Sequence, residues 1–170
     1  MSNLVIPVGI PGSGKSTWGK TLLGGGKYSI VCSDDIRRRL WGSLTEAHNC
    51  TPEEKSMRTT LVWKAFYADV EDKLRHNVDV YADATNLRDF ARAKLRDIAE
   101  RTNADVHLIL FDNVNQALDR NLSREEDKVV PSDVQEDFVK ALAFVRGDLV
   151  SGEESEYNTV TRIENLGPND

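Results

Sequence analysis

A glycine-rich stretch that ends in one lysine and two hydroxyl side chains carries the clearest chemistry in this sequence. Residues 9–17 read Gly-Ile-Pro-Gly-Ser-Gly-Lys-Ser-Thr and match the phosphate-binding pattern G-x-x-x-x-G-K-S/T. Glycines let backbone N–H groups wrap closely around phosphate oxygens, while the lysine would bridge the β- and γ-phosphates and the first hydroxyl would hold Mg²⁺. The pattern predicts a site for ATP or another NTP, contacted by Gly9, Gly12, Ser13, Gly14, Lys15, Ser16 and Thr17, with Ser16 as the metal ligand.

The segments on either side of this loop support that interpretation. Leu4–Gly9 is apolar and rich in β-branched residues, which favours a buried strand, and Lys15–Leu23 is typical of a helix. Strand, loop and helix in this order distinguish a phosphate-binding loop from a glycine-rich turn with an incidental lysine. The N-terminus of the helix would also favour a bound anion.

An aspartate and an arginine follow the next strand candidate, Tyr28–Ser33. Asp34 is placed to accept the proton of a hydroxyl that attacks a γ-phosphate. Arg37 lies one helical turn later on the same face and could hold a substrate phosphate. The alternative is that Asp34 caps the helix that starts there, a role that Asp35 or Ser33 could share.

A second carboxylate ends the strand candidate Asp79–Asp83. Ligands bind where the strands of a parallel sheet end, so Asp83 should lie near the loop at residues 9–17. Asp83 could orient Arg37 or a magnesium-bound water, or it could cap the turn before the next helix. Thr85 and Asn86 fit either phosphate contacts or turn chemistry.

Two arginines, Arg120 and Arg124, are spaced four residues apart, which predicts that both leave one face of a helix. Arginine suits the delivery of positive charge to phosphates during transfer. Residues 125–130 are polar and lack apolar periodicity. This is typical of a mobile lid, which we expect over about residues 115–132. The alternative is a solvated helix end, where arginine favours the helix dipole.

The elements that must position these residues alternate along the chain. Strands are expected at Leu4–Gly9, Tyr28–Ser33, Asp79–Asp83, Val106–Phe111 and Thr159–Ile163, and helices at Lys15–Leu23, Asp34–Leu40, Pro52–His76, Leu87–Thr102, Val114–Ser123 and Ser132–Val145. Thr51 and Ser132 are expected to cap their helices. The alternation predicts an α/β fold of three layers, with a central, mainly parallel five-stranded sheet flanked by helices. Residues 1–170 are expected to form a single domain.

The composition excludes several classes of protein. With 39% hydrophobic and 29% charged residues, the chain is expected to be folded and soluble. No apolar run approaches the ~20 residues that span a bilayer, so no membrane partner is expected. Met1-Ser2-Asn3 leads directly into the first strand, and Cys32 and Cys50 are too few for a disulfide framework, so a cytoplasmic protein without signal peptide is expected. The net charge of −6 argues against broad adhesion to nucleic acid, but it allows a small basic cleft.

Four elements together resemble the bacteriophage-type polynucleotide 5′-kinase domain. They are the loop at residues 9–17 with Trp18, the run Ser33-Asp34-Asp35-Ile36-Arg37, the run Asp83-Ala84-Thr85-Asn86-Leu87, and the run Arg120-Asn121-Leu122-Ser123-Arg124 with Val130-Pro131. Their order and spacing match over about residues 3–145. The D-x-D-x-T signature of the phosphatase domain fused to some relatives is absent, so a kinase without phosphatase activity is expected.

The resemblance implies a P-loop kinase fold that transfers the γ-phosphate of ATP, with Mg²⁺, to the 5′-hydroxyl of DNA or RNA. It implies that Asp34 activates this hydroxyl and that Arg37 contacts the neighbouring phosphate. It also makes Asp83 a site carboxylate and lets Arg120 and Arg124 close on the ATP phosphates. Two other hypotheses remain open. One is a kinase of a nucleoside, sugar or antibiotic, and the other is a module that binds or hydrolyses NTP without an acceptor.

Overall fold

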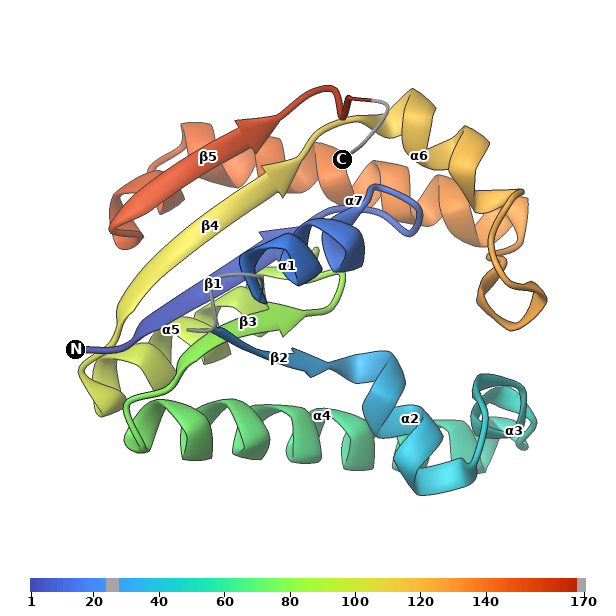
Figure 1. Cartoon of the computed structure of the whole chain (residues 1–170). Helices are drawn as coiled ribbons and strands as arrows, with labels where there is room; N and C mark the ends of the chain where they lie inside the picture. The colour runs from blue at the N-terminus through green and yellow to red at the C-terminus, as the bar shows by residue number, and fades with distance from the viewer. Residues whose placement is uncertain (24–27, 168–170) are drawn as a thin grey trace.

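The computed structural model describes residues 1–23 and 28–167, and its centre is a five-stranded sheet (Figure 1). The strands are β1 (Asn3–Val8), β2 (Tyr28–Cys32), β3 (Asp79–Asp83), β4 (Asp105–Phe111) and β5 (Thr159–Ile163). They lie in the order β2-β3-β1-β4-β5, and every neighbouring pair is parallel. The predicted α/β fold with a five-stranded sheet is therefore confirmed.

The central strand β1 carries the register of the sheet. Leu4 lies opposite Val80 of β3 and Val106 of β4. Five of the six residues of β1 are buried, because helices cover both faces of a parallel sheet. This leaves only the strand ends open to ligands, and β1 ends at Val8, directly before the glycine-rich loop.

Helices pack on both faces of the sheet and complete the three layers. They are α1 (Lys15–Leu23), α2 (Ser33–Trp41), α3 (Leu44–His48), α4 (Pro52–Arg75), α5 (Asp89–Thr102), α6 (Val114–Asn121) and α7 (Ser132–Val150), with the short 3₁₀ helices η1 (Glu126–Lys128) and η2 (Glu153–Glu156). The larger core cluster joins the sheet to α4, α5 and α7, and includes Phe66, Leu95 and Leu142. On the other face Trp18 of α1 packs against Tyr81 and Phe111. None of the helices in the described ranges is long and apolar enough to cross a membrane.

The two predicted helix caps differ in outcome. Thr51 and Glu54 form a reciprocal capping box at the start of α4, in which the Glu54 amide donates to Thr51 Oγ1 over 3.3 Å and the Thr51 amide donates to Glu54 Oε2 over 3.0 Å. The expected cap by Ser132 is wrong. Pro131 occupies the N-cap position of α7 without a side-chain cap bond, because Ser132 already belongs to the first turn of the helix.

Three helices differ most from the expectation, while α2, α4 and α5 differ from their expected bounds by one or two residues. α3 was not predicted, although the Ser43 hydroxyl accepts a hydrogen bond from the Glu46 amide over 3.0 Å at its start. α7 continues to Val150, five residues beyond the expected end at Val145. α6 stops at Asn121, before the predicted end at Ser123, and this early stop changes the position of Arg124.

Candidate active site

The loop after β1 has a backbone that glycine makes possible. Gly12 and Gly14 have φ angles of 87° and 93°, in the left-handed region that side chains rarely adopt. A Cβ atom on Gly12 would collide with the carbonyl oxygen of Ala117 in α6. The Asn113 side chain donates to the Ser13 carbonyl over 3.1 Å, while Ser13 itself is buried. The loop is thus held from outside by α6 and the residue before it.

Lys15, the first residue of α1, is folded back into this loop. Its ammonium group donates to the carbonyl oxygens of Gly9 at 2.9 Å and Ile10 at 2.8 Å and to Ser13 Oγ at 3.1 Å. Burial lowers the pKa of Lys15 to about 8, while the nearby Asp83 carboxylate acts in the opposite direction. The loop therefore holds a cation whose charge is easily lost just above neutral pH.

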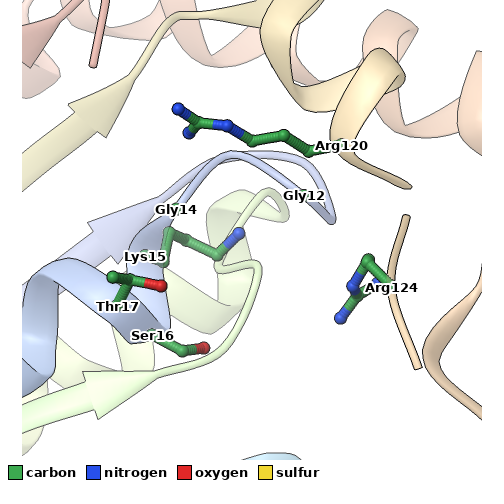
Figure 2. Close-up of a pocket in the computed structure, with 7 residues that line it drawn as sticks. All are labelled: Gly12, Gly14, Lys15, Ser16, Thr17, Arg120 and Arg124. Atoms are coloured by element: carbon green, nitrogen blue, oxygen red, sulfur yellow. The ribbon is translucent and has the colours of Figure 1, made fainter. Parts of the chain in front are cut away.

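A cavity of about 400 Å³, which we call the loop cavity, opens over this segment. It is lined by Gly12, Gly14, Lys15, Ser16, Thr17, Arg120 and Arg124. Figure 2 shows the Ser16 and Thr17 hydroxyl groups at the start of α1, with the two arginines approaching the loop from different sides. The structure therefore brings five of the seven predicted phosphate-binding residues and both predicted arginines to one cavity, whereas Gly9 and Ser13 are buried and do not line it.

The prediction that Arg120 and Arg124 leave one face of a helix is wrong. Arg120 is in α6, but Arg124 lies beyond its end and donates to the Lys128 carbonyl oxygen over 2.6 Å. The reason is Asn121, whose side chain donates to the Val130 carbonyl over 2.9 Å and accepts from the Val130 amide over 3.1 Å. This pair closes residues 122–130 into a loop that contains η1, which we call the lid loop, and it lies within residues 115–132, where a mobile lid was expected.

A wider cavity of about 650 Å³ adjoins the loop cavity, and Lys15, Ser16 and Arg124 line both. We call it the wide cavity. Its polar lining includes the sequence-predicted residues Asp34, Arg37, Asp83 and Thr85. Its apolar lining comes from α3, α4, the lid loop and α7, and includes Leu44, Trp63, Val129, Val134 and Phe138.

Asp34 and Arg37 form an ion pair on the wall of the wide cavity. Arg37 Nη1 donates to Asp34 Oδ1 over 3.0 Å, and the two side chains are 21% and 36% exposed respectively. The interpretation of Asp34 as a helix cap is wrong, because Cys32 occupies the N-cap position of α2 and no side chain caps it. Asp35 pairs instead with Arg38 over 3.2 Å. Asp34 therefore combines access to the cavity with a fixed orientation.

Asp83 is buried at the end of β3. Burial raises the pKa of this carboxyl group, and hydrogen bonds from the Ser16 hydroxyl and the Cys32 thiol, together with the Lys15 charge, oppose the rise. The groups that favour the charged form of Asp83 are thus Ser16, Lys15 and Cys32, while Arg37 pairs with Asp34. Burial and the Asp83 charge raise the pKa of the Cys32 thiol to about 12, which keeps it protonated as a donor.

The Ser16 hydroxyl and the Asp83 carboxylate fit a magnesium ion. Mg²⁺ prefers hard oxygen ligands and commonly takes only one or two from the protein, with phosphate oxygens and waters completing the shell. In the ranges that the structure describes, no group of three or more His, Cys, Asp or Glu side chains could hold a metal ion. One hydroxyl and one carboxylate match the one or two protein ligands that Mg²⁺ commonly takes.

Thr85 and Asn86 have different surroundings. Thr85 lines the wide cavity, and its carbonyl accepts from the Gly9 amide over 3.1 Å. Asn86 is 2% exposed and donates to the carbonyl oxygens of Pro7 over 2.8 Å and Ala82 over 3.0 Å. The structure does not bring Asn86 to a cavity, and its amide instead ties the ends of β1 and β3 together.

Sequence reasoning missed His48, Lys55 and the apolar wall of the wide cavity. These residues come from α3, α4, the lid loop and α7, and no single short-range pattern connects all of them. One signal was present, since Ser43 and Glu46 have the spacing of a helix start, and Leu44 and His48 lie in the helix that begins there.

Comparisons with known proteins were made on sequence and on structure. A family model described as "AAA domain" matches residues 4–147. A chain of the Pnkp1/Rnl/Hen1 RNA repair complex is 26% identical with a TM-score of 0.69, and the match covers 86% of this chain and 46% of that chain. This chain therefore spans less than half the length of that relative. A search among curated proteins gave no match.

Two further solved structures share the fold at lower identity. The shikimate kinase from Acinetobacter baumannii in complex with shikimate is 17% identical with a TM-score of 0.61, covering 99% of this chain and 87% of that chain. The PezAT toxin–antitoxin system of Streptococcus pneumoniae includes a chain that is 14% identical with a TM-score of 0.75, covering 97% of this chain and 69% of that chain. These likenesses show the fold alone.

Proposed function

The chain belongs to the AAA domain family and has a P-loop kinase-like fold, and from this premise we propose that it transfers the γ-phosphate of ATP to the 5′-hydroxyl end of a nucleic acid strand. The observation that carries the proposal is the shared wall of the two cavities. Lys15, Ser16 and Arg124 line both, while the Asp34–Arg37 pair lines the wide cavity and not the loop cavity. This arrangement suits a donor on one side of the wall and an acceptor on the other.

On the donor side, the triphosphate would lie in the loop cavity. Backbone N–H groups of the loop and the N-terminus of α1 would bind its oxygens, and Lys15 would exchange its carbonyl partners for phosphate. Arg120 and Arg124 would add positive charge from α6 and the lid loop. Ser16, with Asp83 beside it, would hold Mg²⁺, which supplies further charge neutralisation at the phosphates.

On the acceptor side, Asp34 would act as the general base. The acceptor hydroxyl loses its proton to the Asp34 carboxylate, its oxygen forms a bond to the γ-phosphorus, and the bond from that phosphorus to the bridging oxygen of ADP breaks. Arg37 would fix the Asp34 carboxylate through the 3.0 Å pair and face a phosphate of the acceptor. A hydrolase without acceptor has no need of this pair.

Two features support a nucleic acid end as the acceptor. The wide cavity combines aromatic walls, Trp63 and Phe138, with the cations Arg37 and Lys55, which suits a base and its attached phosphate. The 26% identical relative comes from a structure described as an RNA repair complex.

A second candidate is a kinase of a small-molecule hydroxyl, such as a nucleoside or sugar. The formal net charge of −6 favours it, since an acidic surface repels polyanions. An acceptor screen separates the two. With γ-labelled ATP and Mg²⁺, we expect label on DNA or RNA oligonucleotides with a 5′-hydroxyl and none on the same strands with a 5′-phosphate. Label on nucleosides or sugars, with none on any oligonucleotide, would establish the second candidate instead.

A further inference from the structure

A third cavity, of about 220 Å³, lies beside the wide cavity among α2, α3 and α4. We call it the helical cavity. Figure 1 shows these three helices grouped beyond the end of β2. Arg37, His48 and Lys55 line both the wide and the helical cavity, so the two adjoin along a shared wall. The remaining lining residues are Trp41, Ala47, Cys50, Arg58, Thr59 and Val62.

The charge of the helical cavity is opposite to that of the whole chain. Its lining holds three permanent cations, Arg37, Lys55 and Arg58, together with His48 and no carboxylate. The whole chain has 28 Asp and Glu residues against 22 Lys and Arg residues. The helical cavity is therefore a local positive site in an acidic protein, and an anion is the ligand it favours.

Arg58 is held in place with unused donors. Its Nη1 donates to the Glu46 carbonyl over 2.7 Å, and the guanidinium lies over the Trp41 ring at 5.3 Å from the ring centre. Among the described residues its Nε and Nη2 atoms have no hydrogen-bond partner. A guanidinium that is fixed on one edge and free on the other suits a phosphate oxygen.

Lys55 adds a charge that no carboxylate among the described residues pairs with. It is exposed on the first turn of α4, and within the part of the chain that the structure describes its ammonium group has no hydrogen bond or ion pair. Because Lys55 lines both cavities, a ligand that extends from one cavity into the other would pass close to its charge.

We propose that the helical cavity binds the internucleotide phosphate that follows the first one in a single-stranded acceptor, with Lys55 and Arg58 as its partners. The proposal rests on the proposed function, since the wide cavity would hold the terminal 5′-hydroxyl nucleoside and Arg37 its first phosphate. The acceptor is then an oligonucleotide of at least three residues, because a nucleoside 3′-monophosphate leaves the helical cavity empty.

The test compares KM for acceptors of different length, and it compares variants at two neighbouring threonines. We expect KM to fall about tenfold from a nucleoside 3′-monophosphate to a tetranucleotide, at similar kcat. Thr59 lines only the helical cavity and is exposed, so Thr59→Glu puts a negative charge there and should raise KM for the tetranucleotide about tenfold without changing KM for the monophosphate. Thr60→Glu adds the same charge one residue along, outside all three cavities, and should change neither value.

Salt dependence gives a second measurement. A lysine–phosphate contact releases counterions, so Lys55→Ala should flatten the slope of log K against log salt for the tetranucleotide by about 0.7. Lys64→Ala is the matched control, since Lys64 is exposed on the opposite face of α4 and lines none of the three cavities.

The outcomes separate this proposal from the proposed function. Equal KM values for both acceptors, with no effect of Thr59→Glu, would refute the helical cavity as a phosphate site while the kinase activity stands. If no nucleic acid is phosphorylated, the proposed function fails, and fluorescence anisotropy with a labelled tetranucleotide then decides on the cavity. Binding that Thr59→Glu weakens and Thr60→Glu does not would support the site, while absent or unaffected binding would overturn it.

Discussion

The ammonium group of Lys15 has three oxygen partners inside the loop before any nucleotide binds. In the reaction that we propose, a triphosphate would replace these partners, so its affinity would reflect the difference between two sets of hydrogen bonds. Asp34 is in the opposite situation, because among the described residues its carboxylate has one partner, Arg37, and it lines the wide cavity. Lys15 would have to rearrange for the proposed role, while Asp34 is already oriented.

The lowered pKa of Lys15 predicts a pH dependence of ATP binding. The free protein loses the Lys15 proton as the pH rises through about 8, whereas bound phosphates favour the charged form and raise this pKa. ATP binding should therefore take up a proton between pH 8 and 9, and affinity should fall from pH 7 to 9. Calorimetry in buffers of different ionisation enthalpy measures this uptake. Lys20→Ala, an exposed change on the same helix, should leave it unchanged, and an affinity that is constant over this range would contradict the prediction.

The general-base role of Asp34 predicts a specific loss of turnover. Asp34→Asn should lower kcat by about 10²–10⁴-fold, because the amide cannot accept the acceptor proton, and should leave the Kd for ATP nearly unchanged. Single-turnover kinetics with a 5′-hydroxyl oligonucleotide measures the effect. Asp35→Asn is the matched control, since its carboxylate is 73% exposed and pairs with Arg38. Full activity of Asp34→Asn would remove this residue from the base role.

Local spacing explains which of these residues could be grouped from the sequence. Lys15 and Ser16 belong to one loop, and Asp34 and Arg37 to one helical turn, so their neighbours in sequence are also their neighbours in space. The position of Asn86 could not be predicted in this way, because its amide bonds to Pro7, which is 79 residues away in the chain. The chemical roles of all these residues remain predictions.

The lid loop at residues 122–130 contains the short helix η1, but its shape depends mainly on the contact that joins its two ends. Two hydrogen bonds between Asn121 and Val130 join its ends, and within it Arg124 donates to the Lys128 carbonyl. Asn121 is 2% exposed, so the closure is protected from water. The position of Arg124 beside the loop cavity therefore depends on a contact at the base of the lid loop.

Breaking the hydrogen bonds between Asn121 and Val130 should change both the conformation of the lid loop and the rate of the proposed reaction. Asn121→Ala removes both hydrogen bonds and should lower the free energy of unfolding by about 1–3 kcal/mol. Trypsin should cleave faster at Arg124 and Lys128, and kcat should fall because Arg124 loses its position. Limited proteolysis and steady-state kinetics measure these effects. Asn115→Ala, an exposed change in the same helix, should alter neither, and unchanged cleavage in Asn121→Ala would show that other contacts hold the lid loop.

Elements with a strong repeat of apolar residues could be predicted, and those set by distant contacts could not. The bounds of β3, β5 and α1 agree with the sequence-based expectation. α3 has only five residues, too few for a helical period to be recognised. α6 ends early because Asn121 pairs with a residue nine positions later, and no local propensity reveals such a bond.

At the scale of the whole molecule, cations are gathered at the cavities while the chain is acidic. The three cavities are lined by Lys15, Arg37, Lys55, Arg58, Arg120, Arg124 and Lys128, against the acidic residues Asp34, Asp83 and Asp127. An overall charge of −6 makes the remaining surface unfavourable for polyanions. Such a distribution would favour binding of a nucleic acid by its end and disfavour binding along its length.

A buried ion-pair network away from the lining of these three cavities stabilises the whole fold. Arg92 of α5 is 0% exposed and donates to both oxygens of Glu153 over 2.7 Å and to Asp148 over 3.0 Å, which joins α5 to α7 and η2.

Arg92→Met should lower the free energy of unfolding by about 1–3 kcal/mol, because Glu153 loses its two hydrogen bonds from Arg92 and keeps those from Arg96 and the Tyr157 hydroxyl. The Kd of the folded protein for ATP should not change. Urea denaturation and calorimetry measure the two quantities. Lys94→Met, an exposed change on the same helix, should leave stability nearly unaffected. A loss below 1 kcal/mol for Arg92→Met would mean that water or other groups compensate for Glu153.

The wall that the loop cavity and the wide cavity have in common also bears on inhibition. Lys15, Ser16 and Arg124 face both spaces, so the two ligands that we propose would contact the same three side chains. A single compound in which adenosine is joined through a phosphate chain to a second nucleoside would occupy both spaces. Because it binds as one molecule, it would lose translational freedom once, whereas separate donor and acceptor molecules lose it twice. If the chain catalyses the proposed transfer, these shared side chains would therefore make it susceptible to a molecule that imitates donor and acceptor together.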